Sequence, residues 1–512
     1  MLYRLSGHLL TTNKLIKLSS ILLLPSTSFT SFYSLTNLIP KIMLFNENST
    51  ENNLKNNENT LYKQAIFQLN SLQSNVQTIA AINLKQRKNR SDILKEMIEL
   101  LIPLNISLND IDSLNCIHIA GTKGKGSTCA FLESILRQLG YKTGFYSSPH
   151  LIHVRERIQI NGQPISEEIF SKHFFHVFNI LKSSITNQEK MPGYFKFLTI
   201  MAFYIFLIEK VDVAIIEVGI GGENDCTNII ENPIVCGITT LDLDHTSILG
   251  STIAEIAWHK SGIAKPNSSL LTVEQSPEAI EVIKQRSLQL ARVFCINSSF
   301  NNKNVSSSPY FQFLPKNNLN ETNNILNGFE VNNIIYNALS NCKWPGRNGA
   351  HTPISIKFCA QWFKENSFKN NKIQRLLIFH CTGYRDSSQL LPVFKDFNFN
   401  CALFCPAIIE EDNSLTNDSI NLNIDLKKEV GRCYKDYQLW KELFENKNSI
   451  ENSINIINAY CFPSISKTIE WVNQYASNMV KDYQLHVLVT GSLHLVGDTL
   501  AYLGKDLNNE KN

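Results

Sequence analysis

The sequence lacks an apolar run long enough to cross a membrane. Its longest one outside the N-terminal region, FLTIMAFYIFLI at residues 197–208, is followed directly by Glu209 and Lys210, whereas a membrane-spanning helix needs about 20 apolar residues. We therefore expect a buried helix at 197–208 and no membrane insertion. Blocks of one charge are missing as well, since 48 basic and 45 acidic residues give a net charge of +3. This balance gives no support for a nucleic-acid-binding surface.

Cysteine pairs with metal-binding or redox spacing are also absent. The 12 cysteines are scattered along the chain without a C-x-x-C pair. This distribution favours reduced thiols in a reducing compartment over a disulfide framework or a zinc site.

Acidic residues are missing from the start of the chain, where Glu47 is the first. The preceding segment contains many serines and threonines and four basic residues, Arg4, Lys14, Lys17 and Lys41. This composition is typical of a mitochondrial transit peptide, which predicts import of the chain into the matrix, and we assign residues 1–42 to it. A secretory signal with Ile21–Leu24 as its apolar core is the alternative, although that core is short. Translation starting at Met43 would give a second, cytosolic form.

The rest of the chain alternates apolar strands with helix-length segments. After an asparagine-rich segment at 43–60, which we predict to be a disordered linker, one series of strands is expected at 116–120, 142–148, 211–219 and 234–241. A second series is expected at 373–383, 400–408 and 484–492. Such alternation is typical of parallel sheets covered by helices. We therefore predict two α/β domains, at 61–342 and 343–506, with a short tail at 507–512.

A segment rich in glycine and lysine follows the first of these strands. It reads GTKGKGS and consists of Gly121, Thr122, Lys123, Gly124, Lys125, Gly126 and Ser127. Main-chain N–H groups of a glycine turn and of the following helix N-terminus present donors to phosphate oxygens, and Lys125 adds a positive charge. The spacing differs from the common P-loop, so a plain strand-to-helix turn is the alternative. The segment predicts a nucleotide-binding loop.

A longer window around this loop resembles a known family. AGTKGKGSTCAFLESILRQLGYKTGFYSSPHLIHVRERIQINGQPIS, at 120–166, is similar to the folylpolyglutamate synthases, which are Mur-type ATP-dependent amide ligases. Further matching motifs follow in order: MPGYFKFLTIMAFYIFL, VDVAIIEVGIGGENDCTNII, LDHTSILGSTIAEIAWHKSGIAK, KWPGR, CTGYRDSS, LFCPAI and VLVTGSLHLVGDTL. The resemblance implies an N-terminal P-loop-type domain with a mostly parallel sheet and a smaller, Rossmann-like C-terminal α/β domain.

The resemblance also implies a reaction. Family members use ATP to phosphorylate the terminal γ-carboxylate of a folate, and the α-amine of an incoming L-glutamate attacks the acyl phosphate. ATP, folates and L-glutamate are therefore the expected partners, with Mg²⁺ as the metal, K⁺ as a further candidate cation, and a monomer as the expected state. The alternative activity is dihydrofolate synthase, which joins the first glutamate to a pteroate by the same chemistry.

Three candidate metal ligands follow three predicted strands, namely Ser147, Glu217 and His245. By resemblance they match magnesium-binding positions, and the carboxyl ends of parallel strands are where such sites form. Taken singly, they could be a helix cap, a structural ion pair and a core imidazole. Lys260 matches a lysine that family members carbamylate, and with Lys125 it is the predicted catalytic pair. Without the resemblance, Lys260 would be a surface lysine late in the helix 252–260.

The segment 147–160 resembles the loop that approaches the folate. Its His150, Arg155 and Arg157 are candidate partners for substrate carboxylates, because guanidinium groups match carboxylate geometry. The alternative is a solvated run of charges around Arg155 and Arg157.

The sequence departs from the family pattern at KWPGRNGAHTPIS, residues 343–355. Family members place a strand-length segment between the arginine and an Asp-Gly-Ala-His turn, but here Arg347 is followed directly by Asn348. Both residues belong to the predicted nucleotide site, although an amide cannot supply the charge of a carboxylate. A shortened but working enzyme, a noncatalytic folate or nucleotide binder and a gene model that lost a segment remain open.

Overall fold

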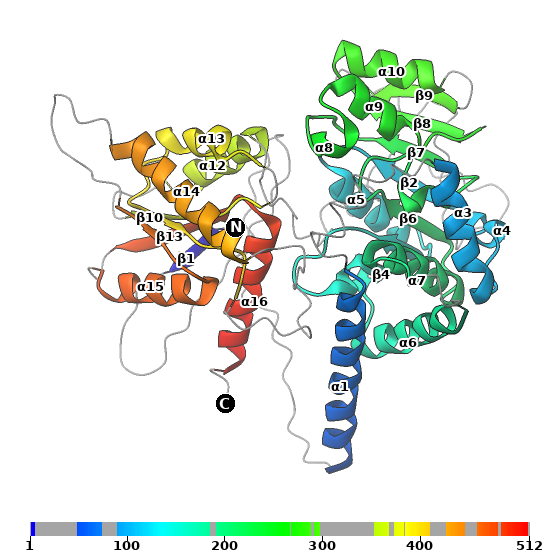
Figure 1. Cartoon of the computed structure of the whole chain (residues 1–512), viewed down its shortest axis with the longest axis horizontal. Helices are drawn as coiled ribbons and strands as arrows, with labels where there is room; N and C mark the ends of the chain where they lie inside the picture. Colours follow the sequence, from blue (N-terminus) through cyan, green and yellow to red (C-terminus); the bar gives the residue numbers. More distant parts are fainter. Residues whose placement is uncertain are drawn as a thin grey trace. The chain divides into compact units, whose positions relative to one another are not determined.

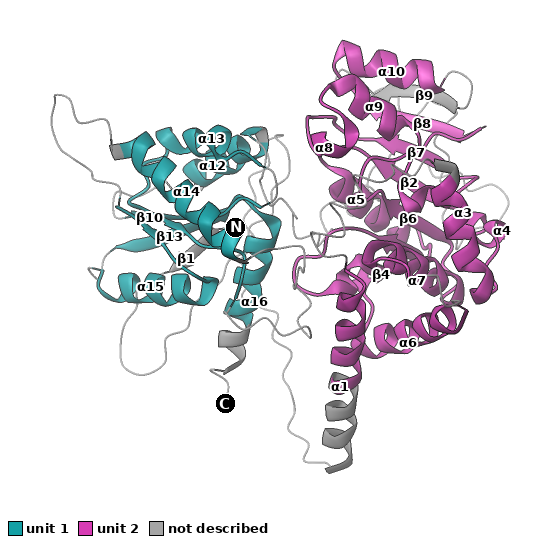
Figure 2. Cartoon of the chain, viewed as in Figure 1, with its two compact units in different colours: residues 1–51, 345–512 teal, residues 52–344 magenta. Residues whose placement is uncertain are grey.

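The computed structural model describes residues 2–5, 49–73, 90–184, 191–266, 268–287, 291–296, 353–367, 373–382, 385–409, 426–445, 458–479 and 483–509. The chain divides into two compact units, one formed by residues 52–344 and the other by residues 1–51 with 345–512 (Figure 2). We call them the N-terminal unit and the C-terminal unit.

The N-terminal unit is built on an eight-stranded sheet of order β5-β4-β3-β6-β2-β7-β8-β9 (Figure 1). Its strands are β2 (Ile117–Ala120), β3 (Thr143–Tyr146), β4 (Ile158–Ile160), β5 (Gln163–Pro164), β6 (Val213–Glu217), β7 (Val235–Ile238), β8 (Ser268–Val273) and β9 (Ala291–Ile296). The pairs from β3 through β9 are parallel, and β4 and β5 add antiparallel pairs at one edge. Strands β2, β3, β6 and β7 confirm the four strands predicted for this part of the chain.

Helices cover this sheet. They are α1 (Ser49–Ser71), α3 (Arg90–Leu101), α4 (Leu108–Asp112), α5 (Lys125–Gln138), α6 (Glu167–Ser184), α7 (Tyr194–Ile208), α8 (Thr246–Leu249), α9 (Ile253–Ser261) and α10 (Pro277–Ser287). Helix α7 is the buried helix predicted at 197–208. Its Phe197 packs 5.2 Å from the ring of Phe174 on α6, and both side chains are fully buried. Each such side chain stabilises the fold by about 1.5–3 kcal/mol relative to an exposed position.

Helix α1 differs from the expectation for its segment. It begins at Ser49, inside the range 43–60 that composition predicts to be a disordered linker. The sequence from 49 to 71 contains no proline or glycine to stop a helix. Its second half places four buried side chains at helical spacing, those of Tyr62, Ala65, Ile66 and Leu69. Packing of this apolar stripe stabilises the helix, so the disorder prediction is wrong for 49–60.

The C-terminal unit contains a five-stranded sheet of order β1-β13-β10-β11-β12. Its strands are β1 (Leu2–Leu5), β10 (Ile373–Phe379), β11 (Cys401–Phe404), β12 (Asn458–Cys461) and β13 (Gln484–Thr490), and its helices are α12 (Pro353–Ser367), α13 (Ser387–Leu390), α14 (Leu426–Glu445), α15 (Ile465–Ser477) and α16 (Leu493–Asn509). Only β1 is antiparallel to its neighbour. Strands β10, β11 and β13 confirm the predicted second series. The core is aromatic, with Trp440 buried against Phe394 and Phe404.

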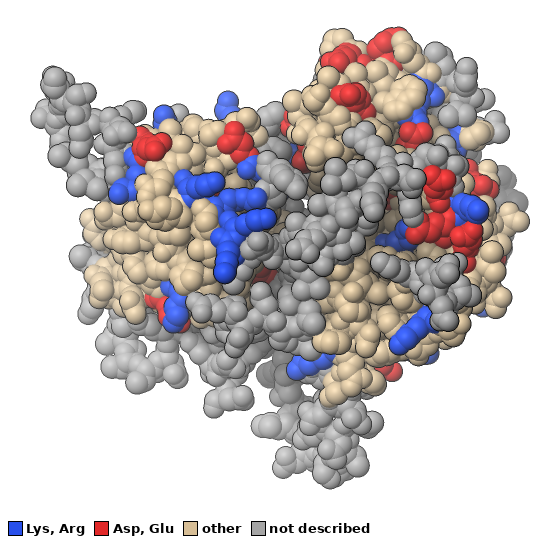
Figure 3. Space-filling view, viewed as in Figure 1, with Lys and Arg blue, Asp and Glu red and all other residues tan. Residues whose placement is uncertain are grey.

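Strand β1 lies within residues 1–42, the predicted transit peptide, whose other residues lie outside the described ranges. Within the described ranges, none of the helices combines the length and apolar character that a bilayer crossing requires. On the visible face of the N-terminal unit, acidic and basic side chains are interspersed (Figure 3).

Candidate active site

The loop rich in glycine and lysine joins β2 to α5, and two of its glycines are required by geometry. Helix α5 begins at Lys125, and its N-cap, Gly124, has a φ of +87° in the left-handed region. Gly121 has a φ of +148°, and a Cβ atom there would lie 1.8 Å from Oγ1 of Thr239. Side chains at either position would strain the backbone, and at Gly121 one would also collide with the segment after β7.

Thr122 and Lys123 fasten the loop to the segment after β7. Their N–H groups donate to the carbonyl oxygen of Thr240 at 3.0 and 3.1 Å. The Thr122 hydroxyl donates to the carbonyl oxygen of Asp242 at 3.0 Å, and Lys123 Nζ lies 3.3 Å from Oδ2 of Asp244. These four donors therefore hold the loop in place within the protein.

The start of α5 supplies the groups that fit a phosphate. The first N–H groups of a helix, here at Lys125, Gly126 and Ser127, have no acceptor inside the helix and carry its positive dipole end. Gly124 leaves open space beside them, since a Cβ atom there would meet nothing within 4 Å. With the Lys125 ammonium, this end of the helix fits the phosphates of a nucleotide.

Ser147 and Glu217 lie at the ends of adjacent parallel strands. The register pairs Tyr146 of β3 with Ile216 of β6, so the two next residues are neighbours. Both side chains are buried, and the N–H of Ser148 donates to Glu217 Oε2 at 3.1 Å. A hydroxyl and a carboxylate are hard oxygen donors of the kind that Mg²⁺ prefers.

The third predicted metal ligand, His245, is an exposed residue on another segment. It is the N-cap of α8, with a φ of +52°, and its N–H donates to Oδ1 of Asp244 at 3.0 Å. In the described part of the chain, no group of three His, Cys, Asp or Glu side chains is placed to hold a metal ion. The donors present fit Mg²⁺, which commonly binds one or two carboxylates and completes its shell with water and phosphate oxygens.

Helix α9 carries Lys260 into the interior. The side chain is 3% exposed, so its assignment as a surface lysine is wrong, and its Nζ donates to the carbonyl oxygen of Gly121 at 2.8 Å. Burial lowers the pKa of Lys260 from 10.5 to about 7, and nearby Lys125 lowers it further while Asp244 partly opposes the shift. Much of the side chain is therefore a neutral amine near neutral pH.

The loop after β6 holds site residues that the sequence reasoning missed, Asp225 among them. Gly222 packs directly on α9, because a Cβ atom there would lie 2.8 Å from the carbonyl oxygen of His259. The buried Asp225 carboxylate accepts hydrogen bonds from Ile220 N–H and from both the N–H and the hydroxyl of Thr227, while burial raises its pKa. The two adjacent glycines before an acidic stretch, in GIGGEND, are the signal that could have identified this loop.

The predicted substrate residues form an internal network. Arg157 and His150 are both buried, and Arg157 Nε donates to His150 Nδ1 at 2.9 Å. The guanidinium also lies 5.3 Å from the ring centroid of Tyr194. Arg155 Nη1 donates to the carbonyl oxygen of Ile165 at 3.2 Å. The alternative of a solvated charge run is therefore wrong for Arg157.

The same loop is shaped by an acid between the two arginines. The Glu156 carboxylate accepts hydrogen bonds from three consecutive N–H groups, those of Leu151, Ile152 and His153, at 2.7–2.9 Å. The remaining predicted nucleotide residues, Arg347 and Asn348, lie outside the described residues.

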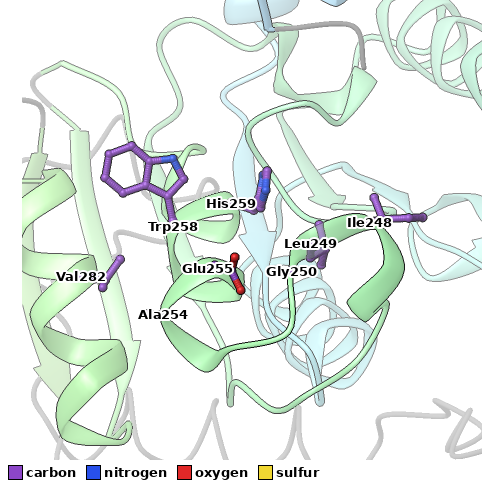
Figure 4. A pocket seen from close by; sticks show the side chains of 8 residues that line it. All are labelled: Ile248, Leu249, Gly250, Ala254, Glu255, Trp258, His259 and Val282. Atoms are coloured by element: carbon purple, nitrogen blue, oxygen red, sulfur yellow. The ribbon is translucent and has the colours of Figure 1, made fainter. Parts of the chain in front are cut away.

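A cavity of about 340 Å³ opens beside α9 (Figure 4). Its lining includes Ile248 and Leu249 of α8, Glu255, Trp258 and His259 of α9, and Val282 of α10. Glu255 is occupied as a helix cap, since it accepts hydrogen bonds from the N–H groups of Ser251 and Thr252. The cavity thus borders the helix of Lys260 without containing a predicted site residue.

Comparison with known proteins identifies the family. No protein-family model matches the chain. It is 39% identical over 487 residues to a putative folylpolyglutamate synthase of Caenorhabditis elegans, covering 87% of this chain and 93% of that protein. The chain belongs to the folylpolyglutamate synthase family. The family resemblance seen in the sequence is thereby confirmed.

Two further relatives agree with this assignment. The mitochondrial folylpolyglutamate synthase of Bos taurus is 34% identical over 562 residues, covering 87% of this chain and 93% of that protein. The structure of a bifunctional folylpolyglutamate synthase/dihydrofolate synthase of Yersinia pestis, complexed with AMPPNP and a Mn ion, matches with a TM-score of 0.55 at 21% identity, over 85% of this chain and 99% of that one. It shows the same fold, and the predicted two-domain α/β architecture is confirmed.

Proposed function

We propose that this chain is an ATP-dependent ligase that adds L-glutamate in γ-linkage to tetrahydrofolate and its polyglutamates. An oxygen of the terminal γ-carboxylate attacks the γ-phosphorus of ATP, and ADP leaves. The α-amine of glutamate then attacks the acyl carbon, the phosphate leaves, and the amine loses a proton as the amide forms. The observation that carries this proposal is the 39% identity to a folylpolyglutamate synthase along nearly the whole chain.

The nucleotide site proposed here is the start of α5 and the loop before it. Lys125 and the N–H groups of Gly126 and Ser127 would bind the phosphates, and Gly121 to Lys123 would hold the loop against the segment after β7. Because these donors are fixed before the nucleotide arrives, they can stabilise charge that develops on the transferred phosphoryl group without reorganising. Arg347 and Asn348 stay part of the proposed site on the sequence argument alone.

The metal site proposed here uses Ser147, Glu217 and His245. The adjacent ends of β3 and β6 support the first two, and Asp244 supports the third by fixing its backbone. Mg²⁺ bound there would neutralise charge between the carboxylate and the ATP phosphates, two anions that otherwise repel. A K⁺ ion is a further candidate on the resemblance alone.

Lys260 is proposed to carry a carbamate. Its neutral amine would attack CO₂, form a C–N bond and release a proton, which turns a buried cation into an anion able to accept hydrogen bonds and steady a metal-bound water. The pKa of about 7 supports this reaction near neutral pH. Carbon-13 NMR in labelled bicarbonate would detect the carbamate, and its absence from the wild type with full activity of Lys260→Ala would contradict the proposal.

The folate carboxylates are proposed to meet the loop of His150, Arg155 and Arg157. Arg157 already bonds His150 and packs on Tyr194, which would limit it to holding the loop, whereas Arg155 is half-buried and its Nε lies without a hydrogen-bond partner. Arg155 is therefore the stronger candidate for a direct carboxylate contact.

Location and assembly are proposed from weaker support. The Bos taurus relative is named mitochondrial, which agrees with a matrix form carrying residues 1–42 as its leader, and Met43 would start a cytosolic form. Tagged chains starting at Met1 and at Met43 would separate these forms by microscopy. The expected monomer can be checked by light scattering of the purified protein.

Incubation of the purified protein with tetrahydrofolate, L-glutamate and Mg·ATP tests the function. Mass spectrometry should find folate products longer by one glutamate each, with one ADP released per glutamate added. Ligation of glutamate to pteroate alone would identify a dihydrofolate synthase. Binding of folate or nucleotide without ADP release would identify a noncatalytic binder.

A further inference from the structure

Arg286 of α10 contacts α9 and the loop after β6 at the same time. Its Nη1 donates to the carbonyl oxygen of Trp258 at 2.6 Å, and its Nη2 forms an ion pair with Oε1 of Glu223. The guanidinium carbon also lies 4.2 Å from the centroid of the Trp258 ring, which projects from α9 toward α10 (Figure 4). The Arg286 side chain is 11% exposed, so this arrangement is better shielded from solvent than an ordinary surface ion pair.

The loop and the helix that Arg286 joins are already in close contact. Glu223 N–H donates to the carbonyl oxygen of His259 at 2.8 Å, and a Cβ atom on Gly262 would lie 2.3 Å from Glu223 Cβ. The Asn228 side-chain amide donates to the carbonyl oxygens of both Glu223 and Gly262 at 3.0 Å. Since main-chain atoms meet here without intervening side chains, a small displacement of one segment must move the other.

Both segments carry candidate groups of the active site. The loop follows directly after Glu217 and contains the buried Asp225, while α9 carries Lys260, whose Nζ bonds Gly121 in the phosphate loop. The position of Glu217 relative to Lys260 therefore depends on how the loop and α9 are held together. No group of Arg286 itself contacts these candidate residues in the contacts described above, so its effect would be indirect.

We propose that Arg286 is a positioning residue of the ligase, which locks the Glu223 loop onto α9 and so fixes Glu217 and Lys260 relative to each other. This inference rests on the proposed function. The position needs arginine, because one planar group donates in two directions and stacks on an indole, whereas a lysine ammonium on its flexible stem would satisfy only one of these contacts well.

The experiment compares the wild type with Arg286→Ala, Arg286→Lys, Glu223→Gln and the double variant Arg286→Ala/Glu223→Gln. Arg137→Ala is the matched control, because Arg137 pairs with Glu133 at 2.9 Å on the same unit, away from the loop and α9. Ligase kinetics at saturating Mg²⁺ give kcat and KM. Calorimetric titration of ADP at a series of Mg²⁺ concentrations gives the Mg²⁺ midpoint for ADP binding without turnover.

Arg286→Ala should lower kcat by about 10- to 100-fold, the range expected when catalytic groups are misplaced by a fraction of an ångström to 1 Å. Its Mg²⁺ midpoint should rise about 10-fold, while KM for ATP and ADP affinity at saturating Mg²⁺ change less than about threefold, because the phosphate loop is intact. Arg286→Lys should recover part of kcat. The double variant should be no slower than Arg286→Ala, since the two side chains act as one unit.

An active wild type whose Arg286→Ala variant keeps both kcat and the Mg²⁺ midpoint would overturn the proposal. If Arg286→Ala fails to fold by circular dichroism, Arg286→Lys decides: a lower melting temperature with unchanged kcat and midpoint shows a merely structural role. A wild type that binds Mg·ADP but ligates nothing would overturn the proposed function instead, and the shift of the Mg²⁺ midpoint would still test Arg286.

Discussion

The two units place chemically different residues at the same topological position. In the N-terminal unit, the ends of β2, β3 and β6 lead into helix N–H groups, a lysine, a serine and a carboxylate. In the C-terminal unit, β10 ends at His380, which is fully buried, with Nε2 2.9 Å from Glu429 Oε2 but poorly aligned for a hydrogen bond. Its Nδ1 lies 3.2 Å from the Cys433 sulfur. The same sheet edge therefore offers groups to a ligand in one unit and uses them for packing in the other.

The turns after the strands explain part of this difference. In the C-terminal unit, a Cβ atom on Gly491, which follows β13, would lie 2.5 Å from the carbonyl oxygen of His380. In the N-terminal unit, a Cβ atom on Gly124 would meet nothing within 4 Å. A glycine therefore closes the sheet edge by tight packing in one unit and leaves room for a ligand in the other.

The largest effect is expected from Lys125→Ala. If this lysine acts on the transferred phosphoryl group like a preorganised oxyanion donor, its removal should raise the barrier by about 2.7 to 4 kcal/mol, or roughly 10²- to 10³-fold in kcat. Steady-state kinetics with saturating folate and glutamate measure this change. Wild-type turnover in the variant would remove the distinction between the two sheet edges.

Glu217→Gln should come next. The amide keeps a similar shape and can still accept from Ser148 N–H, but it loses the charge that a divalent cation requires. We expect the Mg²⁺ concentration for half-maximal activity to rise about 10-fold or more, as for other losses of metal-site support. An unchanged Mg²⁺ dependence would place the metal elsewhere.

In the C-terminal unit, His380→Asn should affect stability more than catalysis. The substitution leaves the buried Glu429 carboxylate with only its contact to Arg432 at 2.7 Å, and a poorly satisfied buried group costs about 1–3 kcal/mol. Chemical denaturation should show this loss with kcat changed less than about threefold. The control is Lys467→Ala, which breaks the exposed pair with Glu470 and should change stability little. A large fall in kcat without loss of stability would give His380 a catalytic role.

The smallest effect is a pH dependence caused by Lys260. Its pKa is about 7 in the folded chain and 10.5 ordinarily, so between these values the unfolded chain binds more protons, and stability rises with pH. Lys260→Met removes this contribution. In nucleotide-free protein without bicarbonate, the stability of the wild type relative to Lys260→Met should increase from pH 7 to pH 10. A constant difference across that range would show that Lys260 titrates normally.

The sequence predicted the strand series in both units because buried parallel strands are continuous apolar runs. It placed Ser147 and Glu217 correctly at strand ends for the same reason. It did not identify Asp225, Asp244 or Arg286, because their roles come from contacts between segments far apart in the chain. Helix α1 was misjudged over 49–60, where composition favoured disorder but an uninterrupted helix continues from a buried apolar stripe.

The roles of the predicted residues divided along similar lines. A family motif could mark Arg155 and Arg157, but only the fold shows that Arg157 is buried against His150 and Tyr194. The same holds for Lys260, whose burial and contact with Gly121 depend on the packing of α9 beside β2. Periodicity reports which face of an element is buried, whereas the partner of a buried charge depends on tertiary packing.

The central claim is that the strand ends of the N-terminal unit bind the triphosphate and its metal. A crystal structure of the full chain with AMPPNP and Mg²⁺ tests it most directly. We predict the phosphates over the N–H groups of Lys125, Gly126 and Ser127, with the metal bound by Ser147 and Glu217. Density for the nucleotide and metal at any other place on the chain would contradict the account.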